Sequence, residues 1–293
     1  MILCRSLSYN RYGEFMAIKP KPYLIPSRPE ILLKLATLLK SAEPDVGAVV
    51  NLLKTDVSLY TVVLSTVNSP LFSRVGRLSS LQQAVMRLGF KRLQTLITVI
   101  SLKRSLSKTG RLDRFWDTST EVAELAARLA GILSVDNPDE AYALGMVHDC
   151  GVPLMMESFS DYRRFLNALE GSDLAGLSSL ERQQYGVDHF TLGAEIAAAW
   201  HMPESVCGAI KLQLHYPLEL LKPSAAINDR SKALFCLVLL AKDISGQYRR
   251  FWRLNTPRES WLELKPALEY LGLPDIDYLD IRDDCLDQLE RVR

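Results

Sequence analysis

A histidine and an aspartate stand side by side in an apolar run near the middle of the chain, in "LGMVHDCGVPLM". Polar side chains are costly to bury unless they are paired. Imidazole and carboxylate groups also bind transition metals, and a bound metal can activate water for hydrolysis. His148 and Asp149 are therefore candidates for a metal site. The alternative is a buried pair whose polar atoms are satisfied by neighbouring protein groups.

Three more histidines and a late aspartate extend this candidate site. All histidines lie in the second half of the chain: His148, His189, His201 and His215. Asp243 is a carboxylate in the same half that could complete a site. Consecutive side chains on a helix diverge by about 100°, so His148 and Asp149 can reach one ion only beside a helix end or a distortion. By residue type and spacing alone, the structural pair is the favoured interpretation.

Two groups of residues are candidates for binding a partner or ligand. In "YRRFWR", Arg249 and Arg250 are interleaved with aromatic residues, and guanidinium groups bind anions and stack on aromatic rings. The stretch from Asn68 to Arg77, which includes Arg74, borders the expected junction between two helical bundles. Concave sites between helices or domains are the usual place for a ligand. We expect partner contacts at these five residues.

Composition limits the function classes. The 293 residues are 48% hydrophobic and 24% charged, which suits a globular protein with a real core. The 35 basic and 34 acidic residues nearly cancel, so the excess of positive charge that drives nucleic-acid binding is missing. The five cysteines form no CxxC pair, which indicates reduced thiols in the cytoplasm. The most apolar run, residues 234–241, is shorter than the roughly 20 residues of a membrane span.

Apolar residues recur at helical spacing along almost the whole chain, which predicts an all-α protein. We expect an irregular arm at 1–28, a helical subdomain at 29–107, a second one at 111–250 and further helices at 251–293. The polar, glycine-containing "SKTGR" marks the boundary between the two subdomains. Gly89 is expected to close a short helix that begins after Ser80. In the second half the expected helices include 113–133, 139–158, 188–200, 203–214 and 229–246.

Several motifs of the chain together resemble the HDOD family, the signalling relatives of the HD and HD-GYP phosphohydrolases. They are "LGMVHDCGVPLMM", the "NSPLF" and "SSLQQAVMRLG" stretches, "YGVDHFTLGAEIAAAWHMPE" and "LLAKDIS", and the resemblance covers about residues 29–247. It implies an N-terminal helical bundle packed on an HD-like multi-helix bundle. It also implies a cytoplasmic bacterial protein of signal transduction or regulation.

The resemblance also assigns metal positions residue by residue. It places the central His-Asp pair at His148 and Asp149 and the late aspartate at Asp243. His189 and His215 match histidines that make additional metal contacts in HD-GYP-like relatives. These five residues are the metal-binding candidates.

The metal site departs from the family pattern and is interpreted as degenerate. Thr118 in "FWDTST" stands where a first histidine ligand is expected, and a neutral hydroxyl is a poor substitute for imidazole. Leu214 replaces one histidine of a doubled pair, Val152 replaces a lysine that follows the His-Asp motif in active phosphohydrolases, and no "GYP" loop follows. Metal-assisted hydrolysis needs both a preorganised ion and cations for the developing phosphate charge.

We therefore predict a non-catalytic regulator that acts by binding proteins or a ligand and has no resident cofactor. As the resemblance implies, its partners are signalling proteins, including those of cyclic-di-GMP or two-component pathways, and not nucleic acid or a membrane. The alternative is a phosphohydrolase acting on a nucleotide or phosphodiester, in which His148, Asp149 and Asp243 hold manganese, iron, magnesium or nickel. The oligomeric state is left open, with a dimer as one option.

Overall fold

The computed structural model describes residues 23–68, 78–107, 112–135, 137–168, 174–220, 222, 227–251 and 261–291. This part of the chain is helical and contains no strand, which confirms the all-α prediction. In chain order the helices are α1 (Glu30–Leu38), α2 (Val46–Lys54), α3 (Val57–Val67), α4 (Leu81–Leu106), α5 (Asp113–Leu133), α6 (Pro138–Val147), α7 (Gly151–Ser158), α8 (Tyr162–Ala168), α9 (Leu174–Tyr185), α10 (His189–Ala199), α11 (Glu204–Leu212), α12 (Asp229–Phe251), α13 (Trp261–Leu271) and α14 (Asp275–Arg291).

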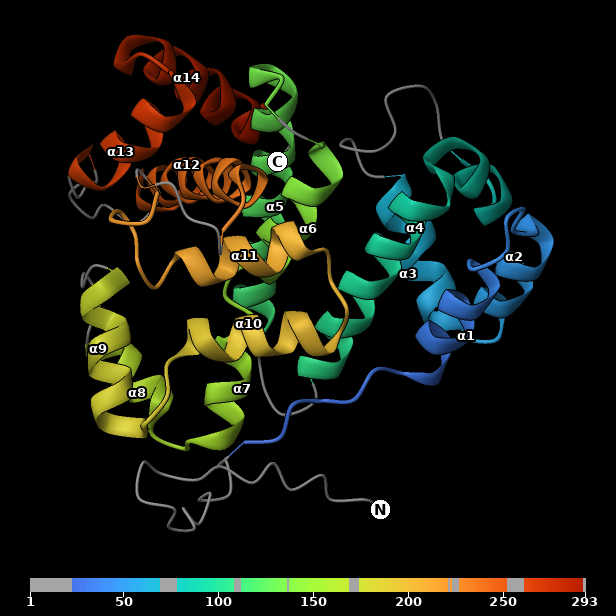
Figure 1. The fold of residues 1–293 in the computed structure, drawn as a ribbon. Helices are drawn as coiled ribbons and strands as arrows, with labels where there is room; N and C mark the ends of the chain where they lie inside the picture. The colour runs from blue at the N-terminus through green and yellow to red at the C-terminus, as the bar shows by residue number, and fades with distance from the viewer. Residues whose placement is uncertain are drawn as a thin grey trace.

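Helices α1 to α4 pack together as an N-terminal bundle (Figure 1). Asp45 and Asp56 start α2 and α3, because their carboxylates accept hydrogen bonds from the first free backbone N–H groups of each helix. Ser80 caps α4 in the same way. The backbone of α4 breaks at Gly89, which has φ of 76°, a left-handed value that glycine adopts without steric cost. The break predicted at Gly89 is therefore confirmed.

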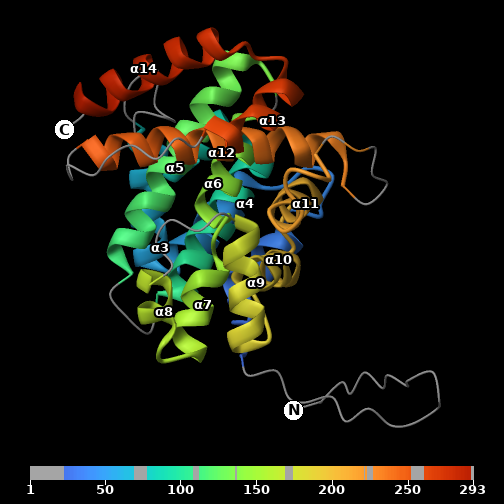
Figure 2. The same cartoon turned by 90° about the vertical axis from the view of Figure 1, so that its left-hand side faces the viewer.

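The second bundle surrounds α12. Helix α5 packs on α6 and α12, α11 packs on α12 and α10, and α10 packs on α7. Figures 1 and 2 show α13 and α14 lying across α12, on the side away from α10. The most apolar run of the sequence forms the middle of α12 and is buried, so it is a core helix. No single helix of the described residues is long and apolar enough to cross a membrane, although α2 and α3, bent by 120°, reach that length and hydropathy together.

Two connections join the bundles within the described residues. Helix α4 packs on α6, where Arg92 forms an ion pair with Asp139. The segment before α1 runs past α10 on its way to the N-terminal bundle (Figure 1). There the indole Nε1 of Trp200 donates a hydrogen bond of 2.9 Å to the backbone oxygen of Pro26. The predicted boundary at 107–111 falls mostly on residues 108–111, which lie outside the described residues.

The helix predicted over residues 139–158 is wrong, because the structure divides it. Helix α6 ends at Val147, a turn follows, and α7 begins at Gly151. At Gly151 an added Cβ would lie 1.9 Å from the backbone oxygen of His189 in α10, so the backbones of α7 and α10 approach too closely for a side chain. The turn places His148 and Asp149 between two helices that point in different directions.

Candidate functional site

His148, which is buried, and Asp149, which is partly buried, form a pair at the turn between α6 and α7. The Nδ1 of His148 donates a hydrogen bond of 2.7 Å to the backbone oxygen of Gly145. Its Nε2 lies 3.1 Å from Oδ2 of Asp149. Both ring nitrogens therefore face oxygen atoms of the protein. The backbone oxygen of His148 accepts a further hydrogen bond of 2.9 Å from Nε2 of Gln213.

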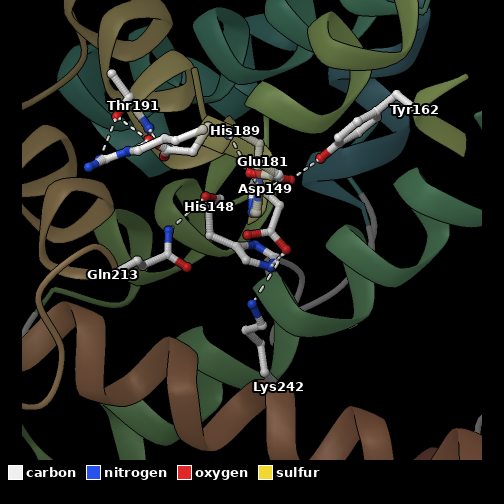
Figure 3. A network of polar contacts seen from close by, with 10 residues as sticks. His148, Asp149, Tyr162, Glu181, His189, Thr191, Gln213 and Lys242 are labelled. Atoms are coloured by element: carbon white, nitrogen blue, oxygen red, sulfur yellow. Dashed lines mark hydrogen bonds and ion pairs between the residues drawn. The ribbon is translucent and has the colours of Figure 1, made fainter. Parts of the chain in front are cut away.

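Lys242 of α12 brings an ammonium group to this carboxylate. Its Nζ lies 3.4 Å from the same Oδ2 of Asp149 that faces His148 (Figure 3). Burial alone would raise the pKa of Asp149, but the charges of His148 and Lys242 hold the pKa of that carboxyl well below its usual range. Asp149 is therefore a carboxylate neutralised by protein cations.

His189, at the start of α10, is oriented by a buried glutamate. Glu181 of α9 is fully buried, and its Oε2 lies 2.7 Å from Nδ1 of His189 and accepts a 3.0 Å hydrogen bond from the His189 backbone N–H. The hydroxyl of Tyr162 donates to the other oxygen of Glu181. His189 is close enough to lower the pKa of Asp149, and Figure 3 shows these side chains gathered around the His148–Asp149 pair. A carboxylate on one imidazole nitrogen fixes both the tautomer and the orientation of the ring.

Asp243 is held by the C-terminal helices. Its Oδ2 accepts a hydrogen bond of 2.7 Å from the hydroxyl of Tyr278, a fully buried residue of α14. Successive helical residues point about 100° apart. Because Lys242 faces Asp149, the neighbouring Asp243 faces a different part of the bundle.

His215 lies at a cavity whose lining includes neither His148 nor Asp149. This cavity of about 490 Å³ lies between α10 and the end of α11. Its lining residues are Thr191, Ala194, Glu195, Ala198, Lys211, Leu214, His215, Glu219 and Ile227. The structure thus gathers His148, Asp149 and His189, and it places Asp243 and His215 in other surroundings.

The predicted partner-binding residues are described only in part. Asn68 is the residue that ends α3, and its amide joins the two ends of the segment that follows. Its Nδ2 donates to the backbone oxygens of Leu64 and Leu78, both at 2.9 Å, and its Oδ1 accepts from the Leu78 N–H. Arg74 and Arg77 lie outside the described residues. Arg249 and Arg250 belong to α12, but their side chains also lie outside the described part.

The donor atoms in this arrangement do not fit a resident divalent ion. Over the described ranges, no three His, Cys, Asp or Glu side chains form a group that could hold a metal ion. Both nitrogens of His148 face protein oxygens, and Lys242 lies beside the carboxylate of Asp149. Thr118, at the position of the missing histidine, donates its hydroxyl to the Arg114 backbone oxygen at 2.8 Å within α5.

Sequence reasoning missed three residues of this network: Tyr162, Glu181 and Lys242. Lys242 contacts Asp149 from α12, while Glu181 of α9 contacts His189 and Tyr162 of α8 contacts Glu181. These pairings depend on how the helices pack, so spacing could not reveal them. Lys242 could have been singled out from the sequence, because it is a cation directly after the most apolar run of the chain. A lone lysine there requires either solvent or a countercharge.

Comparisons with known proteins support the same family as the motifs. The sequence model of the HDOD domain family matches residues 25–216. A candidate phosphohydrolase from Shewanella amazonensis has a similar structure, with a TM-score of 0.64, 23% identity, and coverage of 89% of this chain and 90% of that one. A candidate signal transduction protein from Marinobacter aquaeolei has a TM-score of 0.64 and 22% identity, with coverage of 90% of this chain and 57% of that one.

A curated relative extends the likeness to sequence. An uncharacterized protein of Treponema pallidum (strain Nichols) is 25% identical over 199 residues, which are 66% of this chain. The match spans 38% of the length of that relative. The family match covers well over half of the chain, and the helical fold agrees with it. The chain belongs to the HDOD domain family.

Proposed function

We propose that this chain is a bacterial regulatory protein of signal transduction that acts by binding proteins or a ligand rather than by hydrolysis. The observation that carries the proposal is that the polar groups of the His-Asp region bind one another. His148 is bonded through Gly145 and Gln213, and His189 through Glu181. Metal-assisted hydrolysis needs an ion with an open coordination position. Here the same contacts join α6 to the end of α11, and α9 to α10.

The proposed location and partners of the protein follow from the same family resemblance. As the family resemblance implies, we propose a cytoplasmic protein whose partners are signalling proteins, including those of cyclic-di-GMP or two-component pathways. We propose that partners bind the stretch from Asn68 to Arg77, mainly at Arg74 and Arg77. Arg249 and Arg250 form a second proposed contact group. The division into subdomains at 29–107 and 111–250, with 251–293 as an addition, is part of the proposal.

The second candidate function is a metal-dependent phosphohydrolase. One observation favours it: Oδ1 of Asp149 is buried and has no hydrogen-bond partner among the described residues. Buried polar atoms are almost always satisfied, so water or an ion could be the partner of this oxygen. In that function His148, Asp149 and Asp243 would hold a divalent ion, and the ion would activate water for attack on a phosphoester.

A turnover assay separates the two functions. The purified chain is supplied in turn with Mn²⁺, Fe²⁺, Mg²⁺ and Ni²⁺ and tested on cyclic-di-GMP, nucleoside triphosphates and bis(p-nitrophenyl) phosphate. The control is the His148→Ala/Asp149→Ala double variant. We expect both proteins to release product at the same background rate. Turnover by the unchanged chain that disappears in the double variant would establish the phosphohydrolase instead.

The binding role has its own test. Proteins that copurify with the tagged full chain from its host are compared with those that copurify with an Arg74→Glu/Arg77→Glu variant. We expect the charge reversal to remove at least one specific partner, because a guanidinium pairs with carboxylate or phosphate groups and a carboxylate repels them. An unchanged set of partners would remove this segment from the proposal.

A further inference from the structure

We propose that Lys242 is a built-in cation that takes the place of a divalent ion at Asp149, and that its removal would let the Asp149 carboxylate bind such an ion. The inference rests on the proposed function, in which the chain acts without a metal. It explains why a member of a family related to metal-dependent hydrolases keeps its His-Asp pair although the surrounding donors do not fit an ion.

The geometry around Asp149 is the first support. Oδ2 of Asp149 lies 3.4 Å from Nζ of Lys242 and 3.1 Å from Nε2 of His148, so the ammonium and the imidazole share one oxygen. The side chains of Lys242 and Asp149 are 28% and 22% exposed, so bulk water screens their attraction only in part. Figure 3 shows Lys242 rising from α12 toward the carboxylate. An ammonium in this position repels any divalent ion that approaches the same oxygen.

The register of α12 is the second support. The family resemblance assigns the late metal contact to Asp243, one residue after Lys242. The two side chains diverge on the helix, and Asp243 is bonded to Tyr278 of α14. Helix α12 therefore presents a cation to the His-Asp pair where a metal site needs a further carboxylate.

Without Lys242, the Asp149 carboxylate is the group that would gain most from a bound cation. Its Oδ1 is buried and has no hydrogen-bond partner within the described residues, and its Oδ2 would lose the lysine countercharge. A carboxylate that has lost a countercharge gains more from binding a cation. His148 lies beside it, and the orientation of His189 is already fixed by Glu181. Carboxylate donors suit Mn²⁺.

The test is a titration of the whole chain with Mn²⁺ in a calorimeter. Elemental analysis after gel filtration measures the bound Mn²⁺ independently. We expect Lys242→Ala to bind one equivalent at least about tenfold more tightly than the unchanged chain. Lys242→Arg keeps the cation and should bind no better than the unchanged chain. Adding Asp149→Asn to Lys242→Ala should abolish the gain. Lys211→Ala, which removes a lysine at the separate cavity, is the matched control and should show no gain.

Thermal unfolding gives a second readout. Mn²⁺ should raise the Tm of Lys242→Ala and leave that of Lys242→Arg unchanged, because an ion that binds only the folded state stabilises it. If Lys242→Ala does not fold, Lys242→Met replaces it, since methionine keeps an apolar stem without the charge.

The outcomes separate this inference from the proposed function. Stoichiometric Mn²⁺ on the unchanged chain would overturn both. An unchanged chain without bound Mn²⁺, together with a Lys242→Ala protein that gains no affinity, would overturn the role of Lys242 and leave the regulatory function standing. A gain that persists in the Lys242→Ala/Asp149→Asn protein would also overturn the inference, because the ion would then bind elsewhere.

Discussion

The hydroxyl of Tyr278 in α14 donates a hydrogen bond of 2.7 Å to the carboxylate of Asp243 in α12. Burial and the neighbouring Asp243 raise the pKa of Tyr278, so its hydroxyl remains a donor at neutral pH. Tyr278 is fully buried, and Cys285 of the same helix is buried as well. A carboxylate that the family resemblance assigns to metal binding thus serves here to attach the C-terminal helix.

Replacement of Tyr278 by phenylalanine should therefore destabilise the protein. The change leaves the aromatic ring in place and removes the hydrogen bond to a carboxylate, so we expect a loss of about 2 kcal/mol in the free energy of unfolding. Urea denaturation measures it. Tyr270→Phe is the control, because its hydroxyl makes a longer, solvent-exposed hydrogen bond of 3.2 Å to the Asp229 backbone oxygen. Equal losses in the two variants would contradict the special role of the Asp243 contact.

Glu181→Gln should lower the free energy of unfolding more than a Glu→Gln substitution at the surface does. The fully buried carboxylate accepts hydrogen bonds from His189 and Tyr162, and a glutamine cannot provide the same charge and acceptors. Leaving buried hydrogen-bonding groups without a partner costs about 1–3 kcal/mol. Chemical denaturation checks this, with Glu157→Gln, an exposed position on α7, as the control. If the two variants are equally stable, the Glu181–His189 pair does not stabilise the bundle.

The stability of the protein should depend on pH through Asp149. Its pKa is lowered in the folded state, so the folded protein releases this proton more readily than the unfolded chain does. The resulting stabilisation is fully present above the unfolded value of about 3.9 and is lost as the pH falls through the lower, folded value. Asp149→Asn removes this dependence.

The measurement is the free energy of unfolding of both proteins from pH 7 downward. We expect the difference between the unchanged chain and Asp149→Asn to be constant at neutral pH and to shrink below about pH 4. Asp275→Asn, at an exposed position of α14, should track the unchanged chain throughout. A difference between the unchanged chain and Asp149→Asn that stays constant to the lowest pH would show that Asp149 titrates normally.

Gly151→Ala should prevent or severely weaken folding. The added methyl would meet backbone atoms of His189 and Gly193 in α10, and backbone cannot move aside as a flexible side chain can. We expect a loss of more than about 4 kcal/mol, measured by thermal or urea unfolding. Gly131→Ala in α5 meets nothing within 4 Å and should stabilise the helix by up to about 1 kcal/mol. Normal stability of Gly151→Ala would mean that α7 and α10 are farther apart than described.

Local signals predicted most of the helices because their causes are local. Ser80 caps α4 and Gly89 breaks it, as the sequence predicts. Gly151 and Pro153 indicate a distortion just after His148 and Asp149, but the predicted helix still ran through this turn, because the cause of the turn lies elsewhere in the chain. Gly151 must approach the backbone of His189, about forty residues later, and no pattern within residues 139–158 records that contact.

The candidate site shows the same division between local and distant causes. The His-Asp pair and His189 could be recognised from motifs, and the structure gathers them. Their partners could not, because Glu181 and Lys242 reach them from α9 and α12. Motif matching assigns a role to Asp243, but only packing decides whether α12 turns Asp243 or Lys242 toward the pair.

The segment before α1 has a mechanical consequence. Besides the Trp200 contact with Pro26, the hydroxyl of Tyr23 donates a hydrogen bond of 3.2 Å to Oε2 of Glu195, so this segment is fastened to α10 at two points before it reaches the N-terminal bundle. The N-terminal bundle is thus attached to the second bundle at its beginning, through this segment, as well as at its end, where α4 leads on toward α5. Tension applied upstream of Tyr23 would be borne first by α10, the helix that carries His189, and only afterwards by the N-terminal bundle.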